Sequence, residues 1–142
     1  MADTPIRLLI VDDDEAMRMA CRRVFERSPP PRGIAISEAD SGEQAIEMLR
    51  ADPFDCVLSD YRMGALTGIE VLAFAMKNRP KAVRIMMSGF GSPDLVMAAT
   101  LQARIHEFIE KPMTSQELEA VLKESVLERY LKLIPPPANQ PT

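Results

Sequence analysis

The sequence predicts an α/β domain in which five buried parallel strands alternate with five helices. Five short runs are rich in Ile, Val, Leu and Met, which is typical of strands that are buried on both faces. Segments with helical periodicity separate these runs, and parallel strands need such crossover connections. The strands are predicted at residues 6–11, 34–37, 56–59, 83–87 and 105–109.

The first helix is predicted at residues 15–27, directly after an acidic run. Asp14 precedes it and is predicted to cap it, because an anion is favourable at a helix N-terminus. The side chains of this segment divide into an apolar side, which faces the core, and a basic side. The apolar side contains Met17, Cys21, Val24 and Phe25, and the basic side contains Arg18, Arg22 and Arg23. The basic side is either a solvated face or a docking surface for a partner protein.

Four further helices are predicted from the same periodicity and from their capping residues. Ser41 suits an N-cap because Gln44 stands three residues later, as in a capping box. Ser92 precedes Pro93, whose missing N–H does no harm at the first helical position. These helices are predicted to begin at Ser41 and at residues 66, 93 and 115. The last three are predicted to end at residues 78, 102 and about 131. The inward-facing residues are Ala45, Met48 and Leu49 in the helix that begins at Ser41, and Leu118, Val121, Leu122 and Val126 in the last helix.

Charged residues follow three of the predicted strands. Asp12, Asp13 and Asp14 follow the first, Asp60 closes the third, and Lys111 follows the fifth. For a doubly wound sheet we predict the flavodoxin-like (βα)5 strand order 2-1-3-4-5. In such sheets ligands bind beyond the carboxyl ends of the strands, where the winding reverses between the first and third strands. The sequence therefore predicts a site for a divalent cation and a phosphoryl group at this edge.

Composition indicates one compact domain and excludes several classes of protein. The chain has 142 residues, of which 46% are hydrophobic, and this is enough for one core. A net charge of -4 argues against nucleic-acid binding, which depends on clustered Lys and Arg. Cys21 and Cys56 are too few for a disulfide framework. Neither a cationic leader nor an apolar run of about 18 residues is present, so we expect a cytoplasmic protein without a membrane span.

At these positions the sequence resembles the receiver domains of bacterial two-component response regulators. The resemblance covers about residues 6–130, and its marks occur in the order and strand context of that family. They are the pair Asp12 and Asp13, Asp60 with Met63 and Gly68, Ser88 with Gly89, Phe108, and Lys111 with Pro112. The resemblance implies a receiver domain at residues 1–132, followed by a Pro-rich tail or linker at 133–142. It also implies a signalling switch that is not an enzyme and at most catalyses its own phosphorylation and dephosphorylation.

The resemblance implies a role for each marked residue. Asp60 would accept a phosphoryl group from a phosphohistidine or a small acyl phosphate. Mg²⁺, for which Mn²⁺ can substitute, would be held by Asp12, Asp13, Asp60 and the backbone carbonyl of Arg62, in the hard oxygen shell that it prefers. Lys111 would bring a point charge to the phosphoryl oxygens, and its bond to Pro112 is expected to be cis.

Ser88 and Phe108 would carry the signal onward. The Ser88 hydroxyl would move to donate to a phosphoryl oxygen, and Phe108 would turn into the space that it leaves. The last strand and its flanking helices would then present a changed surface. The expected partners are a sensor histidine kinase or phosphotransfer protein and a downstream protein or output domain, with a phosphorylation-dependent homodimer as a further possibility.

The sequence departs from the family pattern at a few positions. Gly64 stands where the family usually has Pro, so altered loop dynamics are expected, and Met113 replaces an aromatic residue. The resemblance places Arg62 and Phe90 at the mouth through which hydrolytic water arrives. Our hypothesis is that Phe90 shields the acyl phosphate and lengthens its life.

Other interpretations of the same residues remain open at this stage. Asp12 and Asp14 also resemble the Asp-x-Asp motif of haloacid-dehalogenase-type phosphohydrolases, in which Asp12 would be the nucleophile. That family needs a further acidic motif after the lysine, and here only Glu117 and Glu119 follow, on the last helix. A degenerate receiver that only binds partners is the third alternative. Taken singly, the acidic run suits a solvated turn, and Phe108 suits a core aromatic.

Overall fold

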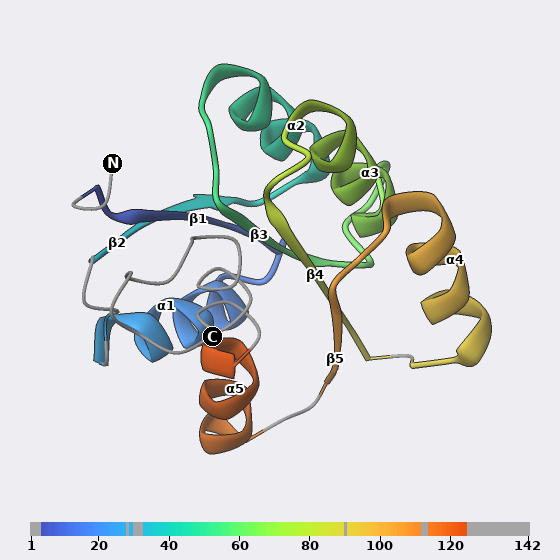
Figure 1. Ribbon diagram of the computed structural model, residues 1–142. Helices are drawn as coiled ribbons and strands as arrows, with labels where there is room; N and C mark the ends of the chain where they lie inside the picture. The colour runs from blue at the N-terminus through green and yellow to red at the C-terminus, as the bar shows by residue number, and fades with distance from the viewer. Residues whose placement is uncertain (1–3, 28, 30–32, 90, 112–113, 125–142) are drawn as a thin grey trace, which may run out of the picture.

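Five parallel strands form one sheet in the order β2-β1-β3-β4-β5, which confirms the predicted fold class (Figure 1). The structure is a computed structural model that describes residues 4–27, 29, 33–89, 91–111 and 114–124. The strands are β1 (Ile6–Val11), β2 (Ile34–Ala39), β3 (Cys56–Asp60), β4 (Val83–Ser88) and β5 (Glu107–Glu110). The helices are α1 (Glu15–Arg27), α2 (Gly42–Ala51), α3 (Gly68–Asn78), α4 (Pro93–Ala103) and α5 (Ser115–Leu122).

Helices cover both faces of the sheet, as Figure 1 shows: α1 and α5 lie on one face, and α2, α3 and α4 lie on the other. The buried apolar residues of the strands therefore pack into two clusters, one on each face of the sheet. In β1, Leu8 and Ile10 join the cluster beneath α1 and α5, and Leu9 and Val11 join the other. This explains why the three inner strands, β1, β3 and β4, are mainly apolar and buried on both sides.

The capping residues lie where the sequence predicts them. The Asp14 side chain accepts a hydrogen bond from the Ala16 amide at the start of α1. Ser41 accepts from the Gln44 amide at the start of α2, but the Gln44 side chain accepts from the Asp40 amide rather than from the Ser41 amide, so the predicted capping box is only half formed. Ser92 accepts from the Leu95 amide, with Pro93 in the first turn of α4. These side chains satisfy amide donors that the first helical turn leaves unpaired.

Three predicted boundaries are wrong by two residues, and local contacts explain two of them. The second strand, β2, continues to Ala39 rather than ending at residue 37. The third helix begins at Gly68 rather than at residue 66, because Thr67 forms a capping box with Glu70. The last strand begins at Glu107 rather than at residue 105. Arg104 adopts a left-handed conformation with φ of 47°, and the His106 Nδ1 atom accepts a hydrogen bond from the Arg84 amide of β4. The His106 amide still donates to the Arg84 carbonyl, but the Arg84 amide bonds a side chain, so the paired strand begins at Glu107.

The end of the last helix is only partly described. Leu118 is buried against the α1 face of the sheet, as predicted. The predicted continuation to residue 131, the tail at 133–142 and the side chains of Val121, Leu122 and Val126 lie outside the described residues. Within the described part of the chain, each helix is too short or too polar to cross a membrane.

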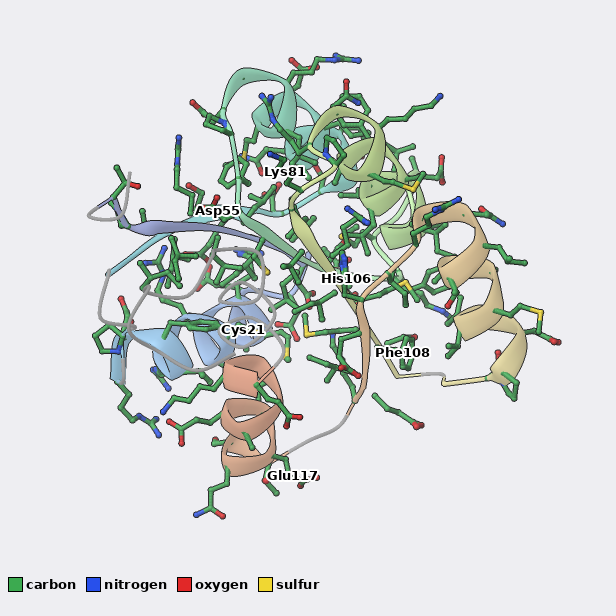
Figure 2. The ribbon with its side chains drawn as sticks, in the orientation of Figure 1. Cys21, Asp55, Lys81, His106, Phe108 and Glu117 are labelled. Atoms are coloured by element: carbon green, nitrogen blue, oxygen red, sulfur yellow. The ribbon has the colours of Figure 1, made fainter. Side chains whose placement is uncertain are left out.

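Both cysteines are free and buried beneath the helices. Burial, with a smaller contribution from the charge of Asp12, raises the pKa of the Cys21 thiol to about 12, and burial raises the pKa of Cys56 as well. Their thiols are therefore protonated at neutral pH. In this uncharged form they act as small apolar groups in the core. Figure 2 labels Cys21 on α1 at the side of the helix that faces α5.

Candidate functional site

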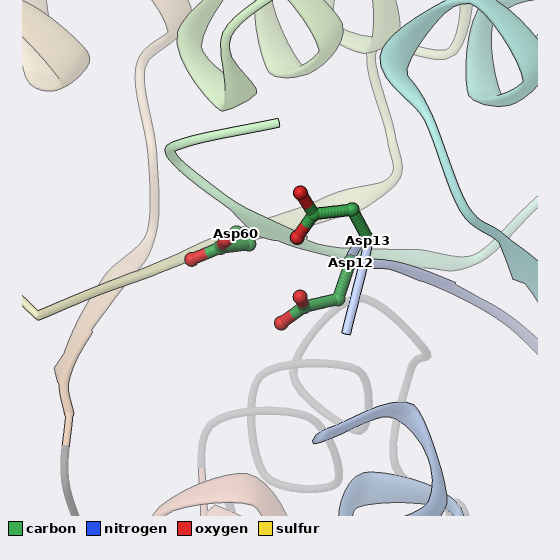
Figure 3. Close-up of side chains that lie close together, drawn as sticks. All are labelled: Asp12, Asp13 and Asp60. Carbon is green, nitrogen blue, oxygen red and sulfur yellow. The ribbon is translucent and has the colours of Figure 1, made fainter. Parts of the chain in front are cut away.

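Three carboxylates converge at the carboxyl ends of β1 and β3. Asp12 and Asp13 directly follow β1, and Asp60 is the last residue of β3. The parallel register pairs Val11 with Ser59, which places Asp12 beside Asp60. One oxygen from each of the three carboxylates lies within 4.8 Å of the others, and Figure 3 shows the three groups around a common space.

Lys111 brings an ammonium group to the same place. Its Nζ atom lies 3.0 Å from Asp12 Oδ2 and 3.1 Å from Asp60 Oδ1. The Lys111 amide donates to the Ser88 carbonyl, which fixes the residue at the end of β5. The lysine thus reaches across β4 to residues that lie 99 and 51 positions away in the sequence.

Burial makes the electrostatics of this pocket strong. The Asp12 side chain is 1% exposed and the Asp60 side chain is 11% exposed. Burial and the charge of Asp12 raise the pKa of Asp60 above its usual range, although Lys111 works against this rise. Burial alone lowers the pKa of Lys111, but the bonds and charges of Asp12 and Asp60 outweigh it, so that the pKa is raised. The lysine therefore stays charged, and ionised Asp60 remains unfavourable beside Asp12.

The donor set fits a hard divalent cation. Three carboxylates against one ammonium leave two negative charges in the pocket. Carboxylate oxygens are the ligands that Mg²⁺ prefers, and an added cation would lower the repulsion that raises the pKa of Asp60. Arg62, which is expected to offer its carbonyl, lies exposed in the loop after β3.

Asp12 is fixed through each of its polar groups. Its amide donates to the Ala39 carbonyl of β2, at 3.1 Å. Its carbonyl accepts from Arg18 Nη1 at 2.6 Å, and its Oδ1 atom accepts from the Asp14 amide at 2.9 Å. Its Oδ2 atom accepts from Lys111. Asp12 is therefore a rigid element of the site, whereas the adjacent Asp13 is exposed.

Two glycines shape the loop that follows Asp60. A Cβ atom on Gly68 would lie 2.2 Å from the Asp60 carbonyl oxygen, so the start of α3 packs directly on the end of β3. Only glycine permits so close an approach. Gly64 adopts a φ of 89°, which the proline ring cannot reach. The loop therefore follows a path that the proline usual at this position would forbid.

Ser88 and Phe108 lie on the two strands beyond Asp60. Ser88 ends β4, is 2% exposed, and is paired in register with Glu110. Phe108 of β5 is half-buried against the cluster beneath α2, α3 and α4 (Figure 2). A groove of about 230 Å³ adjoins its ring between α4 and β5, and is lined by Val96, Thr100, Ile105, His106, Glu107 and Phe108. The ring thus lies at the border between core and surface.

Periodicity misplaced one arginine. The helical pattern predicts Arg18 on the basic side of α1, but its side chain is only 14% exposed and contacts Asp12 and Glu38. Arg22 also bonds Glu38, and Arg23 is exposed as expected. The available signal was local: a cation in the first turn of a helix opposes the helix dipole and needs another reason to be there.

Some predicted features lie outside the described residues. These are Phe90 with its shielding role, Met113, and Pro112 with the expected cis bond to Lys111.

Comparison with known proteins identifies related sequences. A family model described as "Response regulator receiver domain" matches residues 8–123. The chemotaxis protein CheY of Pseudomonas aeruginosa is 32% identical over 127 residues, covering 87% of this chain and 98% of CheY. The hydrogenase transcriptional regulatory protein HoxA of Cupriavidus necator is 31% identical over 89% of this chain. The chain spans 25% of the length of HoxA and 27% of that of GlrR from Escherichia coli.

Solved structures share the same fold. A CheY-like response regulator receiver domain protein from Methanospirillum hungatei superposes with a TM-score of 0.78 at 26% identity, covering 91% of this chain and 99% of that one. The signal receiver domain of the putative response regulator NarL from Mycobacterium tuberculosis gives a TM-score of 0.75 at 25% identity, with 87% and 98% covered.

Proposed function

The chain belongs to the family of response regulator receiver domains, and on that premise we propose that Asp60 is its phosphoacceptor. The observation that carries this proposal is the convergence of Asp12, Asp13 and Asp60 with Lys111 at one edge of the sheet. In the proposed reaction an Asp60 oxygen attacks the phosphorus of a phosphohistidine. The bond from phosphorus to the imidazole nitrogen breaks, and the imidazole leaves with its electron pair.

Charge repulsion is the main obstacle to this reaction, because an anionic carboxylate approaches an anionic phosphoryl group. Asp12, Asp13, Asp60 and the Arg62 carbonyl would hold Mg²⁺ or Mn²⁺, which supplies positive charge to the phosphoryl oxygens when bound. Lys111 already bonds Asp60 and stays protonated. Its ammonium group would leave the carboxylates and bind a phosphoryl oxygen, so that its positive charge lies beside the negative charge of the transferred group.

We further propose that Ser88 and Phe108 report the phosphorylated state. Ser88 ends the strand beside Asp60, so its hydroxyl needs only a local shift to reach the new oxygens. Phe108 has a half-buried ring beside a groove, so it can exchange one packing position for another. Two discrete packings of one side chain are what a switch requires, and phosphorylation need only favour one of them.

The proposed partners are a sensor histidine kinase or phosphotransfer protein upstream and a downstream protein or output domain. A receiver unit over residues 1–132, with 133–142 as tail or linker, is part of this proposal. The outer side of α4 supports a partner face near the switch, because Met97 is 61% exposed and Leu101 is 74% exposed. A phosphorylation-dependent homodimer would use the same face. The free buried cysteines suit the reducing cytoplasm that we expect.

The phosphohydrolase alternative fits the geometry less well. It requires Asp12 to be a nucleophile, yet both Asp12 carboxylate oxygens accept hydrogen bonds and the side chain is 1% exposed. Asp14, the second acid of that motif, caps α1 instead. The family match does not favour this alternative either.

Phosphorylation of Asp60 is tested by intact-mass spectrometry after incubation with acetyl phosphate and Mg²⁺. We expect a gain equal to one phosphoryl group in the wild type and none in Asp60→Asn. Omitting Mg²⁺ should remove the gain as well. Asp55→Asn is a matched control, because Asp55 lies on the loop before the same strand and bonds the Arg7 amide rather than the pocket. Phosphorylation of Asp60→Asn at the wild-type level would overturn the proposal.

A further inference from the structure

Arg18 is a basic residue that sits beside the acidic pocket without joining it. It lies in the first turn of α1, and helical side chains lean toward the N-terminus of their helix, so its guanidinium returns over the turn that precedes the helix. Its Nη1 atom donates to the Asp12 carbonyl at 2.6 Å. Contact with the backbone, rather than with a carboxylate, leaves all three acidic groups available.

Glu38 of β2 holds the guanidinium in this position. Its Oε1 atom accepts from Arg18 Nε at 3.1 Å, while its Oε2 atom lies 2.7 Å from Arg22 Nη2. Burial alone would raise the pKa of Glu38, but the bonds and charges of Arg22 and Arg18 outweigh it and lower the pKa, so that the carboxylate stays ionised. Arg18 is thus a strong donor that is held in place, and its positive charge is partly balanced by the carboxylate that it shares with Arg22.

The bond to Asp12 acts on the peptide that leads to Asp13. The amide of Asp12 is already fixed to Ala39, so a second anchor on its carbonyl sets the plane of the Asp12–Asp13 peptide. Asp13 is exposed, so packing does not hold its side chain. The direction of the Asp13 carboxylate therefore depends on the backbone that carries it.

We propose that Arg18 is a positioning residue for cation binding, which aims the Asp13 carboxylate at the pocket by holding the Asp12 carbonyl. This inference rests on the proposed function, because it assigns Arg18 a role at the proposed Mg²⁺ site. Outer contacts that orient metal ligands typically change affinity 10- to 100-fold when removed. We expect Arg18→Ala to raise the Mn²⁺ dissociation constant by about tenfold, at the low end of that range.

Arg22→Ala is the matched control. Arg22 lies one turn further along α1, bonds the same Glu38, and loses the same charge on substitution. Its other partners are the Ile36 carbonyl and the Glu26 carboxylate, and none of its bonds goes to Asp12. Removal of positive charge near a cation site favours cation binding, so a purely electrostatic role predicts tighter Mn²⁺ binding in both variants. A positioning role predicts weaker Mn²⁺ binding in Arg18→Ala and not in Arg22→Ala.

The experiment follows the free Mn²⁺ signal by electron paramagnetic resonance as the ion is added to the metal-free protein. Arg18→Lys keeps a donor that can reach the carbonyl, and we expect it to recover part of the affinity. A second measurement needs no metal: the ¹³C chemical shift of the Asp12 carbonyl should change in Arg18→Ala and stay in Arg22→Ala. Glu38→Gln, which loosens Arg18 but keeps it, should weaken Mn²⁺ binding less than Arg18→Ala does.

Two failures can be told apart. If the wild type shows no saturable Mn²⁺ binding, the proposed cation site is wrong and this inference falls with it. If the wild type binds Mn²⁺ but Arg18→Ala and Arg22→Ala bind it equally well, the positioning role alone is overturned. Should Arg18→Ala not fold, equal affinities of Glu38→Gln and the wild type would overturn it instead.

Discussion

The two ends of the sheet both bury charge, but they satisfy it in opposite ways. At the carboxyl end, Asp12 and Asp60 share one ammonium and retain excess negative charge. Near the amino end of β4, Arg84 is 5% exposed and its guanidinium donates to the backbone carbonyls of Pro80, Ala82, Ala103 and Arg104. Carbonyl dipoles thus surround Arg84, whereas Asp60 lies beside two like charges and only one ammonium.

The difference separates a structural charge from one for which we propose a function. The carbonyls of Ala103 and Arg104 end α4, where the helix dipole favours a cation, so Arg84 fastens α4 to β4. Burial and the charge of Arg104 lower the pKa of Arg84. The folded chain nevertheless supplies all the hydrogen-bond acceptors named above for its guanidinium, so Arg84 needs no ligand. The acidic pocket, by contrast, gains from an added cation. Excess charge, rather than burial, marks the site that needs a ligand.

The largest expected effect is on stability and lies at the Arg84 end. Arg84→Met keeps an apolar stem but removes the donors, leaving buried carbonyls unpaired at about 1–3 kcal/mol each. We expect a loss of about 3 kcal/mol or more in the free energy of unfolding, measured in urea, with Mn²⁺ affinity unchanged in the folded protein. Arg79→Met is the control, because Arg79 also donates to carbonyls but through hydrogen bonds that are exposed to solvent. Equal losses of unfolding free energy in Arg84→Met and Arg79→Met would show that the buried hydrogen bonds of Arg84 stabilise the fold no more than exposed ones do.

A smaller effect is expected where the pocket meets α3. In Gly68→Ala the new methyl group would meet the Asp60 carbonyl, so the backbone must shift, at a cost of about 1–3 kcal/mol. Because the shift moves the proposed phosphoacceptor, phosphorylation by acetyl phosphate should slow as well. Gly89→Ala is the control for stability, since a Cβ at Gly89 has no neighbour within 4 Å among the described residues. A Gly68→Ala protein as stable as Gly89→Ala would refute the close packing.

The smallest expected effect concerns pH and the acidic end alone. Burial and Asp12 raise the pKa of Asp60 in the folded protein, so ionisation of Asp60 costs stability. In metal-free protein this cost is absent below the unfolded pKa of about 3.9, and it is complete above the raised folded pKa. Asp60→Asn should therefore be more stable than the wild type at pH 7 in EDTA, by less than the two losses above.

Urea unfolding at several pH values checks this prediction. The advantage of Asp60→Asn should disappear as the pH falls below about 4, and saturating Mg²⁺ should reverse it at pH 7 by stabilising the wild type. A wild type that is more stable than Asp60→Asn in EDTA at pH 7 would mean that Lys111 overcompensates the pocket. Both ends of the sheet would then compensate their buried charge within the fold.

Much of the fold follows from the sequence alone because its signals are local. Continuous apolar runs identified the strands, and capping residues such as Ser41 and Ser92 identified where helices begin. Because the carboxyl ends of parallel strands share one edge, the expected meeting of Asp12 with Asp60 required only the strand order. The ends of the elements were harder to predict, since the start of β5 depends on a bond between His106 and a neighbouring strand.

What the sequence determined by itself is the alternation of strands and helices, and with it which carboxylates share an edge. What only the tertiary structure decided is how neighbouring elements constrain them. The inward turn of Arg18 depends on Glu38 of another strand, and the need for glycine at residue 68 depends on the Asp60 backbone. The physical reason is that periodicity encodes only whether a side chain faces the core. The atoms that it meets there depend on strand register and on the path of distant backbone.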